Sequence, residues 1–209
     1  MIPVKVLATR LLANAAPVLC HVIGVPEGYS SLAILTADSD DPTYIALDEA
    51  TKAADVRVVY TRSLYAGAGN ATTPHAGEVI GILAGPTPGA VRSGLEAALS
   101  TLKRVGFEDL DGVPCLAYTV SRCGSYLAKE AGVSEGISLA YLIAPPLESV
   151  YGLDAALKTA DVKLCKLYAP PTETNFGGGL LTGSQSACEA ACAAFRAAVA
   201  EVTARPQER

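Results

Sequence analysis

The chain has 209 residues, of which half are hydrophobic and 18% are charged, and its formal net charge is −5. A nucleic-acid-binding domain normally presents a basic face, so this acidic balance argues against nucleic acid as a partner. No apolar run approaches the roughly 20 residues of a membrane span, and the first residues lack the apolar core of a signal peptide. We therefore expect a cytosolic protein whose six cysteines are reduced thiols.

The first half of the chain predicts alternating strands and helices. Strands are expected at Val4–Ala8, Ser31–Leu35, Val56–Tyr60 and Glu78–Leu83, and helices at Ala16–Ile23 and Ile45–Ala54. A glycine-rich loop over Tyr65–Thr73 precedes the last of these strands. A longer helix is expected to follow, with Thr87 as its N-cap and Pro88 as its first residue.

The second half predicts the same order of elements after a linker at Lys103–Pro114. Strands are expected at Cys115–Val120, Ser138–Ile143, Val162–Leu167 and Gly179–Thr182, helices at Ser125–Ala131 and Val150–Ala160, and a glycine-rich loop at Pro170–Gly179. An apolar stripe then predicts a long final helix, and it repeats a stripe in the last helix of the first half. The stripe of the final helix is Ala191, Phe195, Ala198, Val199 and Val202, and that of the first half is Val91, Leu95, Ala98, Leu99 and Leu102.

The two halves also share sequence. Gly24–Gly28 (GVPEG) returns as Gly132–Gly136 (GVSEG), and Asp48–Val56 returns as Asp154–Val162. The interval is that of a small domain, on the order of 100 residues, and exceeds the roughly 20–50-residue units of solenoid repeats. The sequence therefore predicts two tandem domains, 1–105 and 113–205, of α/β (α+β) class, each a small, mostly antiparallel sheet covered by helices.

A duplicated domain has consequences for assembly. Two like domains in one chain commonly pack about a pseudo-twofold axis or form part of a pseudo-symmetric ring. Soluble proteins average about 25% charged residues, so the 18% of this chain indicates either surface buried between subunits or an alanine-rich composition.

The motif Asp-x-x-x-Lys-x-Ala-x-Val, present at 48–56 and again at 154–162, resembles a segment of bacterial microcompartment shell domains. Further stretches are similar to the EutL type of shell protein from ethanolamine-utilization microcompartments: Thr36–Tyr44, Arg62–Gly67, Ala144–Glu148 and Thr182–Gln185. The resemblance implies tandem, circularly permuted shell domains. It also implies a homotrimeric, pseudo-hexameric ring that tiles with other shell proteins and gates small substrates through a pore. The expected place is the microcompartment shell within the cytoplasm, and no enzymatic activity and no cofactor are expected.

Asp38, Asp40 and Asp41 form an acidic cluster after a buried strand. Such a cluster is either a solvated turn or a place where carboxylates concentrate cations. The resemblance implies a small pore that binds ethanolamine, lined by Asp40, Asp41, Glu78, Phe107, Thr182, Gly183 and Ser184. Ethanolamine is a cation at neutral pH, and an aromatic wall adds a cation–π contribution of about 0.5 to 2 kcal/mol.

Lys52 and Lys158 stand at equivalent positions near the ends of two predicted helices. They either compensate the helix dipole or, as the resemblance implies, lie at the edge of the ring against the next ring. The resemblance also implies that glycine-rich loops surround the threefold axis and move between closed and open pores. These pore-loop residues are Gly67, Gly69, Asn70, Gly177 and Gly178; the alternative is ordinary flexible turns.

The chain shows no local catalytic signature. Cys188 and Cys192 lie one helical turn apart, but a structural metal site needs four ligands, so packed thiols are expected and no metal site. His21 and His75 are far apart in the sequence. Beside the shell protein we keep a hypothesis from another class, a duplicated regulator that binds an amine through Asp40, Asp41 and Glu78.

Overall fold

The computed structural model describes residues 1–64 and 75–207. The chain folds into two units. The N-terminal unit consists of Pro3–Val105 together with Gly124–Leu127, and the C-terminal unit consists of Gly106–Cys123 and Ala128–Arg209 together with Met1–Ile2. The domain bounds 1–105 and 113–205 stay a prediction; in the structure Met1–Ile2 belongs to the C-terminal unit and Gly124–Leu127 to the N-terminal unit.

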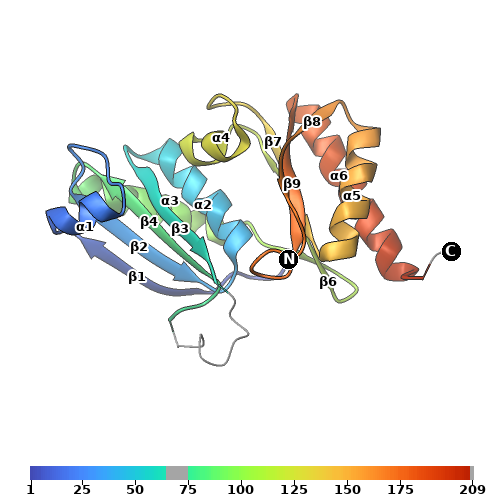
Figure 1. Ribbon diagram of the computed structural model, residues 1–209, viewed down its shortest axis with the longest axis horizontal. Helices are drawn as coiled ribbons and strands as arrows, with labels where there is room; N and C mark the ends of the chain where they lie inside the picture. The colour runs from blue at the N-terminus through green and yellow to red at the C-terminus, as the bar shows by residue number, and fades with distance from the viewer. Residues whose placement is uncertain (65–74, 208–209) are drawn as a thin grey trace. The chain divides into compact units, whose positions relative to one another are not determined.

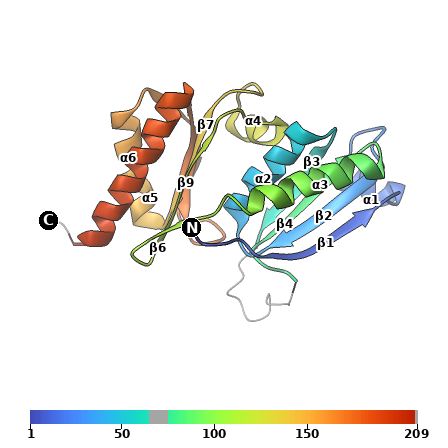
Figure 2. The same ribbon diagram turned by 180° about the vertical axis from the view of Figure 1, so that it is seen from behind.

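The N-terminal unit is an antiparallel sheet with strand order β1-β2-β4-β3. Its strands are β1 (Val6–Leu12), β2 (Ser31–Ala37), β3 (Arg57–Ser63) and β4 (Val79–Gly85). Helices α2 (Asp40–Ala53) and α3 (Pro88–Leu102) cover one face (Figure 2). Short helix α1 (Pro17–Val22) follows β1, and residues around it pack with Leu32, Ile82 and Ala84 in a second, smaller core.

The C-terminal unit repeats this plan with one added edge strand, in the order β5-β6-β7-β9-β8. Its strands are β5 (Glu108–Leu110), β6 (Val113–Val120), β7 (Leu139–Ala144), β8 (Val162–Tyr168) and β9 (Gly177–Gly183). Helices α5 (Pro146–Thr159) and α6 (Gln185–Ala204) lie on one face (Figure 1), and α4 (Ser125–Ala131) follows β6.

The repeat extends to individual hydrogen bonds. The Ser31 hydroxyl donates to the Ala13 carbonyl at 2.7 Å, and the equivalent Ser138 hydroxyl donates to Ser121 at 2.7 Å. Ser31 is buried, and a buried hydroxyl without a partner costs about 1–3 kcal/mol, whereas Ser138 is partly exposed. The same serine-to-backbone hydrogen bond therefore occurs in both units, and the predicted tandem fold is confirmed.

The last helix of each unit buries the same stripe. In α3 the buried residues are Val91, Gly94, Leu95, Ala98, Thr101 and Leu102, and in α6 they are Cys188, Ala191, Cys192, Phe195, Ala198 and Val199. The stripe of α6 thus begins at Cys188 rather than at Ala191, and the expected pairing was wrong by three residues. Cys188 and Cys192 are packed thiols, as expected, and burial raises the pKa of the Cys188 thiol to about 11.

Several element boundaries differ from the predicted ones, most at helix starts. Helix α2 begins at Asp40 instead of Ile45, and α5 begins at Pro146 instead of Val150. Acidic residues and proline are stable in the first helical turn, because the dipole favours negative charge there and proline lacks an N–H that has no intrahelical partner anyway. Asp40 and Asp41 therefore lie in the first turn of a helix, and Asp38 lies in the bend before it. Strand β1 runs on to Leu12, beyond the predicted Val4–Ala8.

Candidate functional site

Asp40 and Asp41 form the buried start of helix α2. One oxygen of Asp40 accepts the backbone N–H of Asp41 at 2.8 Å, and the other accepts the hydroxyl of Ser63 at 2.8 Å. The hydroxyl of Tyr44 lies 2.5 Å from the same Ser63 oxygen. The hydroxyl chain from α2 to the end of β3 holds the Asp40 carboxylate in one orientation.

Glu78 joins these acids from the residue before β4. Its backbone N–H donates to the Ala37 carbonyl at 2.9 Å and its carbonyl accepts from Leu64 at 2.7 Å, so the sheet places it beside the end of β2. Burial, then the nearby charges of Asp40 and Asp38, raise the pKa of Glu78 from 4.5 to about 7. The carboxyl groups of Asp38, Asp40 and Glu78 thus interact at one end of the N-terminal sheet, and Glu78 keeps its proton to a higher pH than an ordinary glutamate.

The stability of the fold is expected to fall with rising pH because of Glu78. In the unfolded chain the Glu78 carboxyl loses its proton near pH 4.5, whereas in the folded chain it keeps the proton until about pH 7. The free energy of unfolding therefore falls as the pH rises between these two values, because only the folded chain still binds the proton there. At pH 8, Glu78→Gln should therefore be about 1–2 kcal/mol more stable than the parent, after allowance for screening at a half-exposed group. At pH 4.5 the two should be equal. Urea unfolding at both pH values measures the difference, with exposed Glu27→Gln as control; a difference that does not change with pH would contradict the assignment.

The other four expected pore residues belong to the C-terminal unit. Phe107 is buried, with its ring 5.3 Å from that of Phe176. The Thr182 hydroxyl donates to the Ser138 carbonyl at 3.0 Å, and Ser184 caps helix α6 by accepting the Ala187 N–H at 3.1 Å. Gly183 leaves no room for a side chain, because a Cβ would lie 2.8 Å from the Asp161 carbonyl oxygen. Each of the four has a local structural role, and their place in a pore stays a prediction.

Of the expected pore-loop residues, the structure describes only Gly177 and Gly178. Gly67, Gly69 and Asn70 lie outside the described residues. Gly177 and Gly178 open strand β9, paired with Ala144 and Ile143, so they are not part of a loop as predicted. Gly178 has φ 150°, and a Cβ there would lie 1.8 Å from the Leu142 carbonyl oxygen. Glycine is required in this strand by the close approach of β7.

Lys52 and Lys158 both lie in the last turn of their helices, as predicted. Lys158 binds Asp154 at 2.6 Å on an exposed surface. Lys52 binds Glu49 and lies 3.8 Å from Asp48. Both positions fit dipole compensation, and the edge role stays a prediction.

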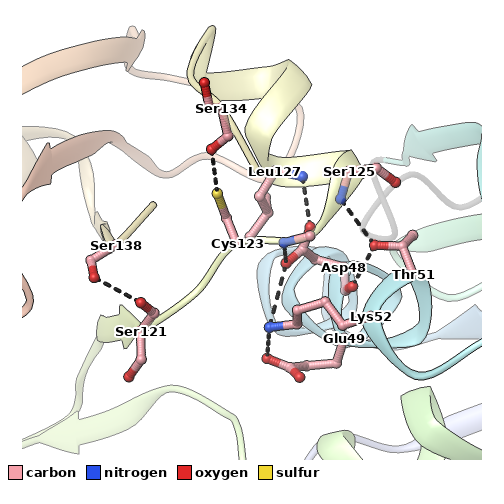
Figure 3. Close-up of polar contacts among 11 residues, drawn as sticks. Asp48, Glu49, Thr51, Lys52, Ser121, Cys123, Ser125, Leu127, Ser134 and Ser138 are labelled. Carbon is pink, nitrogen blue, oxygen red and sulfur yellow. Dashed lines mark hydrogen bonds and ion pairs between the residues drawn. The ribbon is translucent and has the colours of Figure 1, made fainter. Parts of the chain in front are cut away.

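Asp48 holds the start of α4 by hydrogen bonds, a role that the sequence analysis did not predict for it. Its side chain is fully buried, and its two oxygens accept the backbone N–H groups of Gly124 at 2.7 Å and Leu127 at 2.8 Å (Figure 3). One turn further along α2, the Thr51 hydroxyl accepts the N–H of Ser125 at 3.1 Å. Burial raises the pKa of Asp48, against the lowering effect of the two backbone donors. Helix α2 thereby caps the start of α4.

Comparison with known proteins gives the family. The EutL shell protein of Clostridium perfringens is 58% identical in an alignment 207 residues long, which covers 97% of this chain and 95% of that protein. The chain belongs to the EutL family of bacterial microcompartment shell proteins. The crystal structure of the ethanolamine utilization protein EutL from Leptotrichia buccalis, 55% identical, matches with a TM-score of 0.97 and covers 100% of this chain and 98% of that one. A crystal structure of a trimeric shell protein, PduB, shares the fold at 22% identity, with a TM-score of 0.78 over 96% of this chain and 89% of that one.

The BMC domain family matches residues 31–110. This match begins at β2 and leaves β1 and α1 before it, although β1 is paired with β2 in the same sheet. The first sheet thus contains a strand that precedes the matched residues, which fits a circularly permuted domain. The EutL-family fold is thus a permuted domain made twice.

The described residues contain no group of three or more His, Cys, Asp and Glu side chains arranged to hold a metal ion. Within the same residues, no helix combines the length and apolar character needed to cross a membrane.

Proposed function

We propose that this EutL-family chain assembles as a homotrimer whose six repeats form a ring, that the ring tiles with other shell proteins, and that it gates the passage of small substrates such as ethanolamine. The observation that carries the proposal is the duplication of one permuted domain with the same internal hydrogen bonds. A duplicated domain contributes two equivalent surfaces per chain, and three such chains supply the six that a hexagonal tile needs.

The comparisons support this assembly. The PduB protein with the same fold is described as trimeric, and the Leptotrichia protein is described as an ethanolamine utilization protein. The role is that of a barrier and gate in a shell within the cytoplasm, without catalysis. Passage depends on pore width and on the charge of the lining.

In the proposed pore, Asp40, Asp41 and Glu78 attract the ammonium group of ethanolamine. Carboxylates in a narrow cleft raise the local concentration of cations, and the two aspartates are held by α2 in a buried setting where charge is poorly screened. Phe107, Thr182, Gly183 and Ser184 are proposed as further walls. Gly177 and Gly178, with Gly67, Gly69 and Asn70, are proposed to surround the central opening.

The assembly is tested by mass in solution and by electron microscopy of concentrated protein. A shell protein should have three times the 21.4 kDa mass of the chain and should form flat sheets. A regulator that binds an amine should stay as discrete particles at all concentrations, and that result would reject the proposal.

Lys158→Ala should abolish or strongly reduce sheets while the trimer remains. The exposed ammonium of Lys158 on α5 is proposed to donate to backbone carbonyls of the adjoining ring, and alanine removes this donor. Counting sheets in negative-stain images at equal concentration measures the effect, with Lys52→Ala as the equivalent change in the other repeat. Lys103→Ala is the matched control, because Lys103 is an exposed lysine at the end of helix α3. Sheets as abundant in Lys158→Ala as in the control would reject the edge role.

A further inference from the structure

Two hydroxyl groups stand in line behind the Asp40 carboxylate. Ser63 has one hydroxyl hydrogen, which it donates to Asp40 at 2.8 Å. The Tyr44 hydroxyl lies 2.5 Å from the Ser63 oxygen, so Tyr44 is the donor in the contact between them. Tyr44 and Ser63, which we call the hydroxyl chain, thus donate in one direction, toward the acid. Hydrogen bonds in such a chain polarise one another, so the phenol strengthens the bond between Ser63 and the carboxylate.

The hydroxyl chain fixes the direction in which Asp40 accepts further hydrogen bonds. An ionised carboxylate offers about four acceptor sites on its two oxygens. The N–H of Asp41 donates to one oxygen and Ser63 donates to the other, both at 2.8 Å. These two bonds set the plane of the carboxylate group. A ligand that donates N–H groups depends on that plane, because hydrogen bonds weaken when they are poorly aligned.

Tyr44 itself is held in place within the N-terminal unit. It lies one helical turn after Asp40 on α2, so the two side chains share a face of the helix. Its ring lies 6.0 Å from the ring of Tyr126, whose hydroxyl lies 3.3 Å from that of Thr61. Thr61 and Ser63 are two residues apart on β3, so both side chains point to the same side of the strand. The phenol therefore donates from a fixed position.

The acid and both hydroxyls are absent together from the second repeat. The shared motif places apolar residues in the register of Asp40, Tyr44 and Ser63, namely Pro146, Val150 and Ala169. A hydrogen bond that belongs to the common fold occurs in both repeats, since Ser31 and Ser138 each donate to a backbone carbonyl. The hydroxyl chain occurs only in the repeat that has the carboxylate, which fits a role at the carboxylate and not in the common fold.

We infer that Tyr44 is a positioning residue of the proposed cation site. It acts on Asp40 through Ser63 and holds the carboxylate in the orientation that accepts an N–H of a primary ammonium group. The inference rests on the proposed function, in which Asp40 attracts the ammonium of ethanolamine. It adds a residue that the proposed pore lining does not include and that determines how tightly a hydrogen-bonding cation is held.

Calorimetric titration of the assembled protein with ethanolamine tests the inference in a double-mutant cycle. Tyr44→Phe keeps the ring and removes the donor, and its affinity should be about three- to tenfold below that of the parent. Ser63→Ala should lose at least as much, because it removes the bond to Asp40 itself. Tyr44→Phe added to Ser63→Ala should change the affinity by less than about twofold, since the phenol then has no hydroxyl through which to act.

Tyr126→Phe is the matched control for Tyr44→Phe. It makes the same chemical change on the neighbouring ring, but the hydroxyl that it removes contacts Thr61 and not Ser63. We expect Tyr126→Phe to bind ethanolamine as the parent does. If Ser63→Ala does not fold, the comparison of Tyr44→Phe with Tyr126→Phe decides the question alone.

The results separate this inference from the proposed site. Equal affinity in Tyr44→Phe and the parent would overturn the inference, and so would an equal loss in Tyr126→Phe. A loss of the same size with and without the Ser63 hydroxyl would also overturn it, because Tyr44 would then act by packing. In each of these cases weak binding by Asp40→Asn leaves the site standing. No binding by the parent, or full binding by Asp40→Asn, would reject the site and the inference together.

Discussion

Replacing Asp48 with alanine is expected to destabilise the protein by about 2–4 kcal/mol. The change removes the acceptor for the N–H groups of Gly124 and Leu127, which lie in a buried setting. A buried donor without a partner costs about 1–3 kcal/mol. The burial that raises the pKa of Asp48 partly offsets the loss, because the parent bears the cost of a desolvated charge. Asp48→Asn should lose less, since the amide keeps one acceptor oxygen.

Urea unfolding with the parent and the variants measures this effect. Glu49→Ala is the matched control, because Glu49 is the next residue of α2 and its half-exposed carboxylate pairs with Lys52. Hydrogen exchange adds a local readout, since the amides of Gly124 and Leu127 at the start of α4 should lose protection in Asp48→Ala while the amides of the N-terminal sheet keep theirs. Equal midpoints for Asp48→Ala and Glu49→Ala would show that the capping of α4 contributes nothing.

The parts of the fold that depend on neighbours in the sequence were predictable. Helix Ser125–Ala131 has the predicted bounds, and Thr87 caps α3 by accepting the N–H of Ala90 at 3.1 Å, with Pro88 as the first helical residue. Capping residues, proline and apolar periodicity act within a few residues, so their signal is present in the chain itself. The repeat was equally visible, because it is a comparison of the sequence with itself.

The parts that depend on distant contacts were not predictable. The partners of Asp48 are 76 and 79 residues away, and no local pattern indicates that this aspartate, but not Asp154, is buried. The pKa of Glu78 is raised by burial at the meeting of β2 and β4 and then by the charges of Asp40 and Asp38, whereas the sequence left open whether those aspartates form a solvated turn or a cation site. Gly177 and Gly178 were assigned to a loop because glycine has low strand propensity, whereas the close approach of β7 requires glycine in the strand.

Asp40→Asn is expected to weaken ethanolamine binding about tenfold or more, since a hydrogen bond to a charged group contributes about 1.5–3 kcal/mol. The amide keeps the shape of the side chain and one oxygen that accepts from Ser63, but its NH2 group then faces the N–H of Asp41, so the variant loses one of the two hydrogen bonds together with the charge. Isothermal titration calorimetry of the assembled protein measures the affinity. Asp161→Asn, an exposed acid of the C-terminal unit, is the control, and equal affinity in Asp40→Asn and the parent would reject the site.

The protonation of Glu78 makes the same measurement more specific. An ammonium group beside Glu78 favours its ionised form, so binding below pH 7 should release a proton, and affinity should fall as the pH falls from 8 to 6. Titrations in two buffers with different ionisation enthalpies detect that proton. Glu78→Gln should bind more weakly at pH 8 and should lose both the proton release and the pH dependence. If the parent releases no proton at pH 6, the cation does not bind beside Glu78, and the three acids do not act together as one site.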